Sequence, residues 1–423
     1  MDKNIRRYLQ ARGVKGPWKI SGTDRDDFAG AIVIPALAEA DYVWNTINSL
    51  AQNPPEILDK FLTLVVVNHR QDAPPGVKKN NLDTLRMLAT RKDYFQNLSL
   101  AWVDAASPGF ELPPQGGVGL ARKIGFDLAL ERLNYQRNSP LLISLDADTL
   151  VRPDYLPVLV HHFQKSSTGG AILPFCHQPG STLEEDQAIK RYELFLRAYV
   201  LGLKLAGSPY AYHTIGSTMA CTASAYVRAG GMNTRSAAED FYFLQQLAKT
   251  SGLTQVKGTV VYPAARPSWR VPFGTGKSVL KILTSPLGAI KFYQTASFQM
   301  LKNWLDLVSQ HTDLSADNIQ KMAAEISPSL VDFLSRIHFQ EVWPKLQKNY
   351  PSPPQLQSAF HVWFDALKTL QFIHHLSANQ FPKGEPEETL PSLWQWAGFV
   401  PPATLAEHLS LLRRLQISAD YQD

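Results

Sequence analysis

Residues 141–149 read LLISLDADT, an apolar run that ends in two aspartates separated by one residue. A short, continuous apolar run of this kind is typical of a strand buried on both faces of a parallel sheet. In open α/β sheets, ligands bind beyond the carboxyl ends of the strands. The sequence therefore predicts that Asp146 and Asp148 emerge at the ligand-binding edge of such a sheet.

Similar strand-like runs and helical patterns alternate on both sides of this segment. The strand-like runs occupy residues 31–35, 62–67, 98–103, 169–173 and 258–262. Residues 41–50 and 120–128 show the three-to-four-residue apolar spacing of helices. This alternation predicts an α/β fold with a largely parallel sheet flanked by helices.

The secondary-structure pattern of the sequence changes from about residue 279. Strand signals fade, and helical stretches separated by proline-rich breaks follow. Tryptophans recur along this part of the chain: Trp304, Trp343, Trp363 and Trp394. We expect them to form the core of a mainly helical region, because large aromatic residues are mostly buried. The predicted divisions are an extension at 1–29, a catalytic domain at 30–276 and a helical region at 277–423.

Composition and charge limit the classes of partner. The 423 residues carry a net charge of +5 without a long basic run, so nucleic acid is not indicated. The opening residues are charged and no apolar stretch follows them, which argues against a secretory signal. The chain also has only two cysteines, which suits a reducing compartment. We therefore expect a cytoplasmic protein.

The most apolar long segment is residues 194–206. Arg197 and Lys204 interrupt it, and it is shorter than the roughly 18 to 20 residues that a membrane span needs. We therefore expect no transmembrane helix, and interpret this segment as a helix packed on the sheet. Peripheral contact with the inner face of a membrane and formation of a homodimer both stay open.

Two pairs of carboxylates are candidates for chemistry. Asp146 and Asp148 can share one Mg²⁺ or Mn²⁺, which in turn would bridge a diphosphate. Aspartates are also common in loops after strands, where they only stabilise turns. Glu239 and Asp240 begin a helical pattern, where carboxylates stabilise a helix N-terminus. The functional alternative is that one of them, preferably Asp240, is a general base.

The order of these segments resembles that of glycosyltransferase family 2, whose catalytic domain has the GT-A fold. The resemblance rests on IVIPALAE at 32–39, VVVNHRQD at 65–72, GVGLARKIGFDLAL at 117–130, SLDAD at 144–148 and GSTMACTASAYVRAGGMNTRSAAED at 216–240. It implies an inverting transfer of a sugar from a nucleotide-diphosphate sugar to a hydroxyl acceptor, assisted by Mn²⁺ or Mg²⁺. The lipid, glycan or small-molecule nature of the acceptor stays open.

The resemblance also implies roles for individual residues. Asp148 would be the principal metal ligand, Asp146 would contact the metal or the donor's ribose, and Asp240 would be the base beside Glu239. The residues that would line the nucleotide pocket are Pro35, Ala36 and Glu39. Gly216, Gly230 and Gly231 fit a loop close to donor or acceptor, although turns alone also use glycine.

Other positions qualify this assignment. Asn68 stands where the family usually has an aspartate that reads the base, and an amide can both donate and accept, so the base stays open. Arg122 or Lys123 would face the donor phosphates, unless they are ordinary solvated cations. Residues 261–276 contain no histidine that could be a third metal ligand, but they offer Arg266 and Arg270 for bidentate binding of a diphosphate.

The same residues also allow other classes of nucleotide-binding protein to be considered. The stretches at 117–122 and 274–278 lack the glycines of a dinucleotide fingerprint and of a phosphate-binding P-loop. A nucleotidyltransferase would also use a carboxylate-bound Mg²⁺, but it has no evident use for Asp240. A catalytically silent sugar-nucleotide or carbohydrate-binding protein is the alternative from a different class. The sugar and the acceptor cannot be read from the family resemblance.

Overall fold

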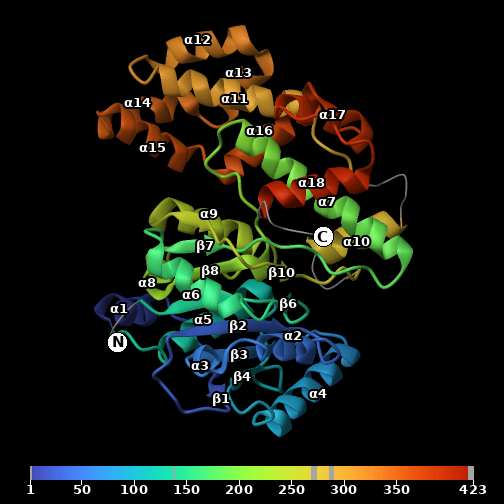
Figure 1. Ribbon diagram of the computed structural model, residues 1–423. Helices are drawn as coiled ribbons and strands as arrows, with labels where there is room; N and C mark the ends of the chain where they lie inside the picture. Colours follow the sequence, from blue (N-terminus) through green and yellow to red (C-terminus); the bar gives the residue numbers. More distant parts are fainter. Residues whose placement is uncertain (1, 137–138, 268–273, 285–289, 418–423) are drawn as a thin grey trace. The chain divides into compact units, whose positions relative to one another are not determined.

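The computed structural model describes residues 2–136, 139–267, 274–284 and 290–417 (Figure 1). These residues form two compact units. The described residues of the first unit are 2–189, 214–284 and 416–417, and those of the second are 190–213 and 290–415. The predicted extension at 1–29 is thus part of the first unit, whereas 190–213 belongs to the second although it precedes residue 276.

In the first unit, the described residues form a sheet of eight strands in the order β1-β4-β3-β2-β5-β8-β7-β9. Their bounds are β1 (Ile20–Ser21), β2 (Gly30–Ala36), β3 (Phe61–Asn68), β4 (Ser99–Ala105), β5 (Leu141–Ser144), β7 (Gly170–Ile172), β8 (Met219–Thr222) and β9 (Leu253–Gln255). Strands β4, β3, β2 and β5 run parallel, while β8 is antiparallel to both of its neighbours. The predicted, largely parallel α/β sheet is confirmed.

The centre of the sheet is fully buried, as its apolar sequence indicates. Every residue of β2, β3 and β5 is buried. Helix α5 (Val118–Leu130) packs on β2 and β3, and α4 (Pro75–Arg91) packs on β3 and β4. On α5, Gly125 has no side chain because a Cβ there would lie 2.3 Å from Cγ1 of Val33. A close helix-to-strand contact therefore fixes α5 over the strands that lead to the ligand-binding edge.

Short helices and one small second sheet complete the first unit. The helices are α1 (Lys3–Arg12), α2 (Val43–Leu50), α3 (Pro55–Leu58), α4 (Pro75–Arg91), α5 (Val118–Leu130), α6 (Tyr155–Lys165), α8 (Ala223–Arg228), α9 (Glu239–Ser251) and α10 (Thr275–Thr284), with a 3-10 turn at Gly216–Thr218. Strand β6 (Leu150–Val151) pairs antiparallel with β10 (Val261–Tyr262). This pairing holds the segment after β10 beside the turn that follows β5.

The amino-terminal helix is attached to α5 through one buried carboxylate. Asp127 accepts hydrogen bonds from the hydroxyls of Tyr8 at 2.9 Å and Tyr226 at 2.7 Å, and from the backbone N–H of Val14 at 2.9 Å. The ammonium of Lys123 lies 2.8 Å from the same carboxylate. A buried charge is tolerated when it is paired and hydrogen-bonded, so this cluster fixes α1 in place.

The second unit consists of helices in the part of the chain that the structure describes. They are the end of α7 (Leu183–Leu205), α11 (Thr295–Gln310), α12 (Ala316–Ile326), α13 (Pro328–Arg336), α14 (Phe339–Asn349), α15 (Pro353–Trp363), α16 (Ala366–Asn379), α17 (Pro386–Trp396) and α18 (Leu405–Gln416). Trp304, Trp343 and Trp394 are fully buried, which confirms that these tryptophans belong to the core. Trp363 is only partly buried.

The apolar segment at 194–206, which the sequence analysis places on the sheet, packs against helices of the second unit. Its residues Leu194 and Leu201 lie in a cluster with Leu393 and Leu412 of the second unit. Helices α11, α17 and α18 provide the apolar faces that cover it, and the sequence pattern alone could not pair them with it. No helix among the described residues combines the length and apolarity that crossing a bilayer requires.

Candidate active site

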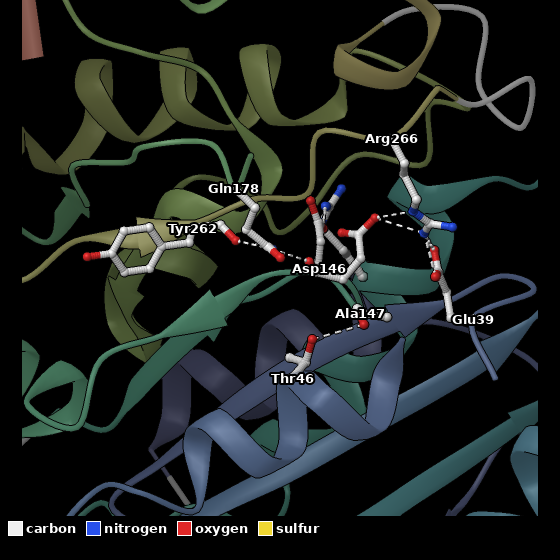
Figure 2. A network of polar contacts seen from close by, with 9 residues as sticks. Glu39, Thr46, Asp146, Ala147, Gln178, Tyr262 and Arg266 are labelled. Atoms are coloured by element: carbon white, nitrogen blue, oxygen red, sulfur yellow. Dashed lines mark hydrogen bonds and ion pairs between the residues drawn. The ribbon is translucent and has the colours of Figure 1, made fainter. Parts of the chain in front are cut away.

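The turn at residues 146–148 follows β5 at the carboxyl edge of the parallel strands, and two side chains hold it there (Figure 2). The hydroxyl of Thr46 donates to the carbonyl of Ala147 at 2.9 Å. The amide nitrogen of Gln178 donates to the carbonyl of Asp148 at 2.9 Å and to a carbonyl of β10 at 2.7 Å. The turn is thus clamped from α2 on one side and from the chain after β7 on the other.

Arg122 forms the first of two arginine networks at this turn. Its side chain is 3% exposed, and its guanidinium donates to Asp146 and Glu239 and, at 3.0 Å, to the hydroxyl of Ser144. Burial would lower the pKa of Arg122, but the charges of Asp146 and Glu239 outweigh burial and raise it. A Cβ at Gly216 would lie 2.2 Å from this guanidinium. The arginine therefore joins β5, the turn and α9 from inside the protein.

Arg266 forms the second network. Its Nε and Nη2 donate to one oxygen of Asp148 at 3.0 and 2.8 Å, and Nη2 also contacts both oxygens of Glu39 (Figure 2). The guanidinium lies 4.1 Å from the ring centroid of Tyr42. Burial would lower its pKa, and Asp148 and Glu39 overcome that effect and raise it. Its side chain is 20% exposed, which is far more than that of Arg122.

The loop that carries Glu39 is shaped by asparagines of α4. The backbone N–H of Ala38 donates to Asn81 at 2.8 Å, and that of Ala40 donates to Asn80 at 3.0 Å. Ala38 has a φ of 55°, a conformation that costs energy for a residue with a side chain. These hydrogen bonds offset that cost and turn Glu39 toward Arg266.

Glu239 and Asp240 occupy the first turn of α9, as their sequence position predicts. Glu239 is buried, and burial raises its pKa despite the nearby charge of Arg122. Burial and the negative charge of Glu239 raise the pKa of Asp240 to about 7. Asp146 adds to this shift, so Asp240 lies within electrostatic reach of the turn after β5. A carboxyl group that titrates near neutral pH can act as a general base or acid.

Among the described residues, this edge of the sheet gathers more negative than positive charge. Its five carboxyl groups are Glu39, Asp146, Asp148, Glu239 and Asp240, and the arginines that contact them are Arg122 and Arg266. Counted over the described residues and with every group ionised, the carboxylates exceed the guanidiniums by three charges. An anionic diphosphate would be repelled by such a site unless a cation accompanied it.

The carboxylates of this edge suit a divalent metal that also binds a substrate. No group of three or more His, Cys, Asp or Glu side chains that could hold a metal occurs within residues 2–136, 139–267, 274–284 and 290–417. Mg²⁺ usually takes only one or two carboxylates and completes its shell with water and substrate phosphates. Asp146 and Asp148 are hard oxygen ligands, one residue apart and partly exposed. The residues therefore fit a cation that binds together with a diphosphate.

The other residues predicted for the site either lie inside the protein or are not described. Pro35 and Ala36 are buried inside β2. The amide of Asn68 donates to the carbonyls of Ala36 and Val66 at 3.2 and 3.0 Å, so it is turned onto the backbone. Lys123 bonds Asp127 and the hydroxyl of Tyr8, away from the acidic edge. Arg270 lies outside the described residues.

The structure adds residues that sequence reasoning missed. Thr46, Gln178 and Ser144 hold the turn or its arginine, and Tyr42 lies against Arg266. No local signal could have found the first three, because their partners are between 22 and 101 residues away in the chain. Gly216 was assigned to a loop near donor or acceptor, and its observed neighbour is Arg122.

Comparisons with known proteins give weak similarity. No family model matches the chain, and no curated protein sequence matches it. The TarS 1-349 fragment of S. aureus, solved with UDP-GlcNAc, is 13% identical over 77% of this chain and 89% of that chain, with a TM-score of 0.39. The mannosyltransferase PcManGT of Pyrobaculum calidifontis, solved with GDP-Man and Mn²⁺, is 15% identical over 97% and 92%, with a TM-score of 0.38. Similarity at this level carries no argument about activity.

Proposed function

We propose that this chain is a metal-assisted glycosyltransferase that moves a sugar from a nucleotide-diphosphate sugar to a hydroxyl acceptor, with inversion at the anomeric carbon. The observation that carries the proposal is the contact of Arg122 with both Asp146 and Glu239. It joins the turn after β5 to the first turn of α9, the two segments that the resemblance to family 2 assigns to donor and base. The excess of negative charge that the described residues give this edge supports the use of a cation.

Asp240 is the general base in this mechanism. Its pKa of about 7, raised by burial and by Glu239, makes it ionised above neutral pH and basic enough to take the acceptor's proton. Glu239 remains paired with Arg122 and holds the start of α9 in position. As the acceptor oxygen attacks the anomeric carbon, its proton passes to Asp240 and the nucleoside diphosphate leaves from the opposite face.

Asp148 and Asp146 would hold the divalent cation, which would neutralise the charge that develops on the leaving diphosphate. Arg266 contacts Asp148 in the structure. On donor binding, we expect its guanidinium to turn to the diphosphate oxygens, for which its planar shape is suited. Tyr42 would continue to support its cationic face.

The first test is a thermal-shift panel of UDP-, GDP- and dTDP-sugars, each with and without Mn²⁺. A ligand that binds only the folded state raises the unfolding temperature, so one nucleotide class should give a shift that depends on the metal. Asp148→Ala should lose this shift. Asp59→Ala is the matched control, because Asp59 is an exposed aspartate of the same unit, paired with Arg25. The absence of a shift with every donor would contradict the proposal.

The rival interpretations predict different products. Slow hydrolysis of the donor to free sugar and nucleoside diphosphate, lost in Asp240→Asn, is expected of the transferase and not of a silent binding protein. A nucleotidyltransferase would instead release pyrophosphate from a nucleoside triphosphate. Proton NMR of the released sugar, recorded before mutarotation, reports whether the anomeric centre was inverted. Retention would contradict the proposed single displacement.

A further inference from the structure

A cavity of about 780 Å³ lies beside the amino-terminal helix and takes no part in the proposed reaction. Helices α1 and α8 and the segment that leads into β5 supply its walls, all from the first unit. Three arginines line it: Arg7 and Arg12 on α1, and Arg228 at the end of α8. Within the described part of the chain, no ion pair of these three arginines occurs.

One carboxylate also lines the cavity, but it already has partners. Asp2 accepts the backbone N–H groups of Asn4 at 2.8 Å and Ile5 at 3.4 Å, so it caps the start of α1. Even with Asp2 ionised, the lining has an excess of two positive charges. The cavity therefore favours a ligand with two or more negative charges.

The walls of the cavity are held in place before any ligand binds. Gly231 has a φ of +80°, and a Cβ there would lie 1.7 Å from the hydroxyl of Tyr8. A Cβ on Gly230 would lie 2.8 Å from Nη1 of Arg12, so this guanidinium is close to the backbone of the opposite wall. Since Asp127 binds the hydroxyl of Tyr8, the position of α1 against α8 is fixed. Because these walls are fixed, only the exposed arginine side chains must become ordered on binding, which limits the entropic cost.

The remaining lining suits a phosphate attached to a small organic group. The hydroxyls of Ser139 and Ser224 lie 3.3 Å apart on one wall and can donate to phosphate oxygens. Ile5 and Val227 add apolar surface. Guanidinium groups bind phosphate through paired, charge-assisted hydrogen bonds.

We propose that this cavity is a binding site for a compound with a phosphomonoester or diphosphate group, separate from the donor site. Ser139 precedes β5 and Asp146 follows it, so the cavity and the acidic turn flank opposite ends of that strand. The two sites also have opposite charge. The inference therefore does not depend on the proposed transferase activity, and each can fail without the other.

Isothermal titration of the full-length protein with inorganic pyrophosphate, in metal-free buffer, tests the site. Arg7→Ser and Arg228→Ser should each raise the Kd by about tenfold, since each removes a charge-assisted hydrogen-bond partner. The matched control is Arg6→Ser, because Arg6 is the neighbouring exposed arginine of α1 and does not line the cavity. It should leave the Kd within about twofold of the wild-type value.

Two results would contradict the proposal of a phosphate-binding site. One is the absence of saturable binding of pyrophosphate to the wild-type protein. The other is an equal loss of affinity in Arg6→Ser and Arg7→Ser, which would mean diffuse attraction by a basic surface. Circular dichroism of each variant shows whether α1 has stayed folded, and Arg228→Ser tests the site from a different helix.

A second measurement distinguishes the source of the phosphate group. Vesicles of phosphatidylcholine containing phosphatidic acid present the same phosphomonoester on a membrane. Sedimentation with these vesicles, displaced by pyrophosphate and lost in Arg7→Ser, would identify a lipid headgroup as the ligand. Binding of pyrophosphate without sedimentation would identify a soluble phosphate compound. Sedimentation that pyrophosphate does not displace would contradict the site.

Discussion

Arg122 and Arg266 each contact two carboxylates at the same edge of the sheet, but from different kinds of position. Arg122 extends from α5, is 3% exposed and also bonds Ser144, so its network is closed off by the core. Arg266 lies in the segment after β10, is 20% exposed and has the ring of Tyr42 on one side. We infer that the contacts of Arg122 keep the turn after β5 and α9 in place. The contacts of Arg266 are replaced by contacts to a ligand when one binds.

The difference follows from the cost of breaking each network. Removing one member of a buried ion pair leaves a charge without compensation and costs about 3–5 kcal/mol. A partly exposed pair is screened by water, and its loss costs much less. We therefore expect Arg122 to keep its contacts with Glu239 and Asp146 when a ligand binds, and Asp148 to be the carboxylate that exchanges its arginine for a cation shared with Asp146.

The largest effect is expected from Arg122→Met, which removes the cation and keeps much of the side-chain volume. It leaves Glu239 buried without its guanidinium, so the free energy of unfolding should fall by about 3–5 kcal/mol and activity should be lost. Urea denaturation measures the change. Arg336→Met, at an exposed arginine of the second unit, is the control and should change stability by less than about 1 kcal/mol. If both variants lowered the free energy of unfolding equally, the Arg122 network would not be the more strongly stabilising one.

Asp240→Asn should reduce kcat by about 10²- to 10⁴-fold, since an amide cannot take the proton of the acceptor. The same change should raise the unfolding temperature at pH 8 by about 2–4 °C, because it removes a buried charge next to Glu239. Asp306→Asn, at an exposed aspartate paired with Lys302, should do neither. Near-wild-type turnover of Asp240→Asn would exclude it as the base.

The pH dependence of activity should report the same carboxyl group. Because Asp240 must be ionised to act, kcat/KM should fall about tenfold per pH unit below its pKa of about 7. Stability changes in the opposite direction: the folded state holds this proton more tightly than the unfolded chain, so stability decreases as pH rises from about 4 to 7. The slope of kcat/KM should be absent in Asp240→Asn, and its persistence there would assign the titration to another group.

The smallest effect on stability is expected from Arg266→Gln, on the order of 1 kcal/mol, because this guanidinium is partly exposed. Its removal frees Asp148 from a competing cation, so Mn²⁺ alone should bind about tenfold more tightly. The donor should bind more weakly, since it loses a bidentate partner. Electron paramagnetic resonance of free Mn²⁺ measures the first quantity and calorimetry the second. Unchanged Mn²⁺ affinity would mean that Arg266 does not compete for Asp148.

Much of the fold was predictable from local patterns. The apolar runs at 31–35, 62–67 and 141–145 became central strands because continuous apolar runs need burial on both faces. The carboxyl end of such a strand lies at the ligand-binding edge, so the location of Asp146 and Asp148 followed from the same pattern. The packing of residues 194–206 did not follow, because periodicity reveals an apolar helix face and not the partner that covers it.

The candidate site also has features that the sequence predicts and features that only the tertiary structure decides. The sequence by itself determined the parallel α/β sheet, the acidic turn after β5 and the carboxylates at the start of α9, since each depends on residues close together in the chain. Only the tertiary structure decided that Arg122 faces these acids while Lys123 faces Asp127. Successive residues of a helix point in directions about 100° apart, and packing of α5 on β2 and β3 selects which one reaches the site.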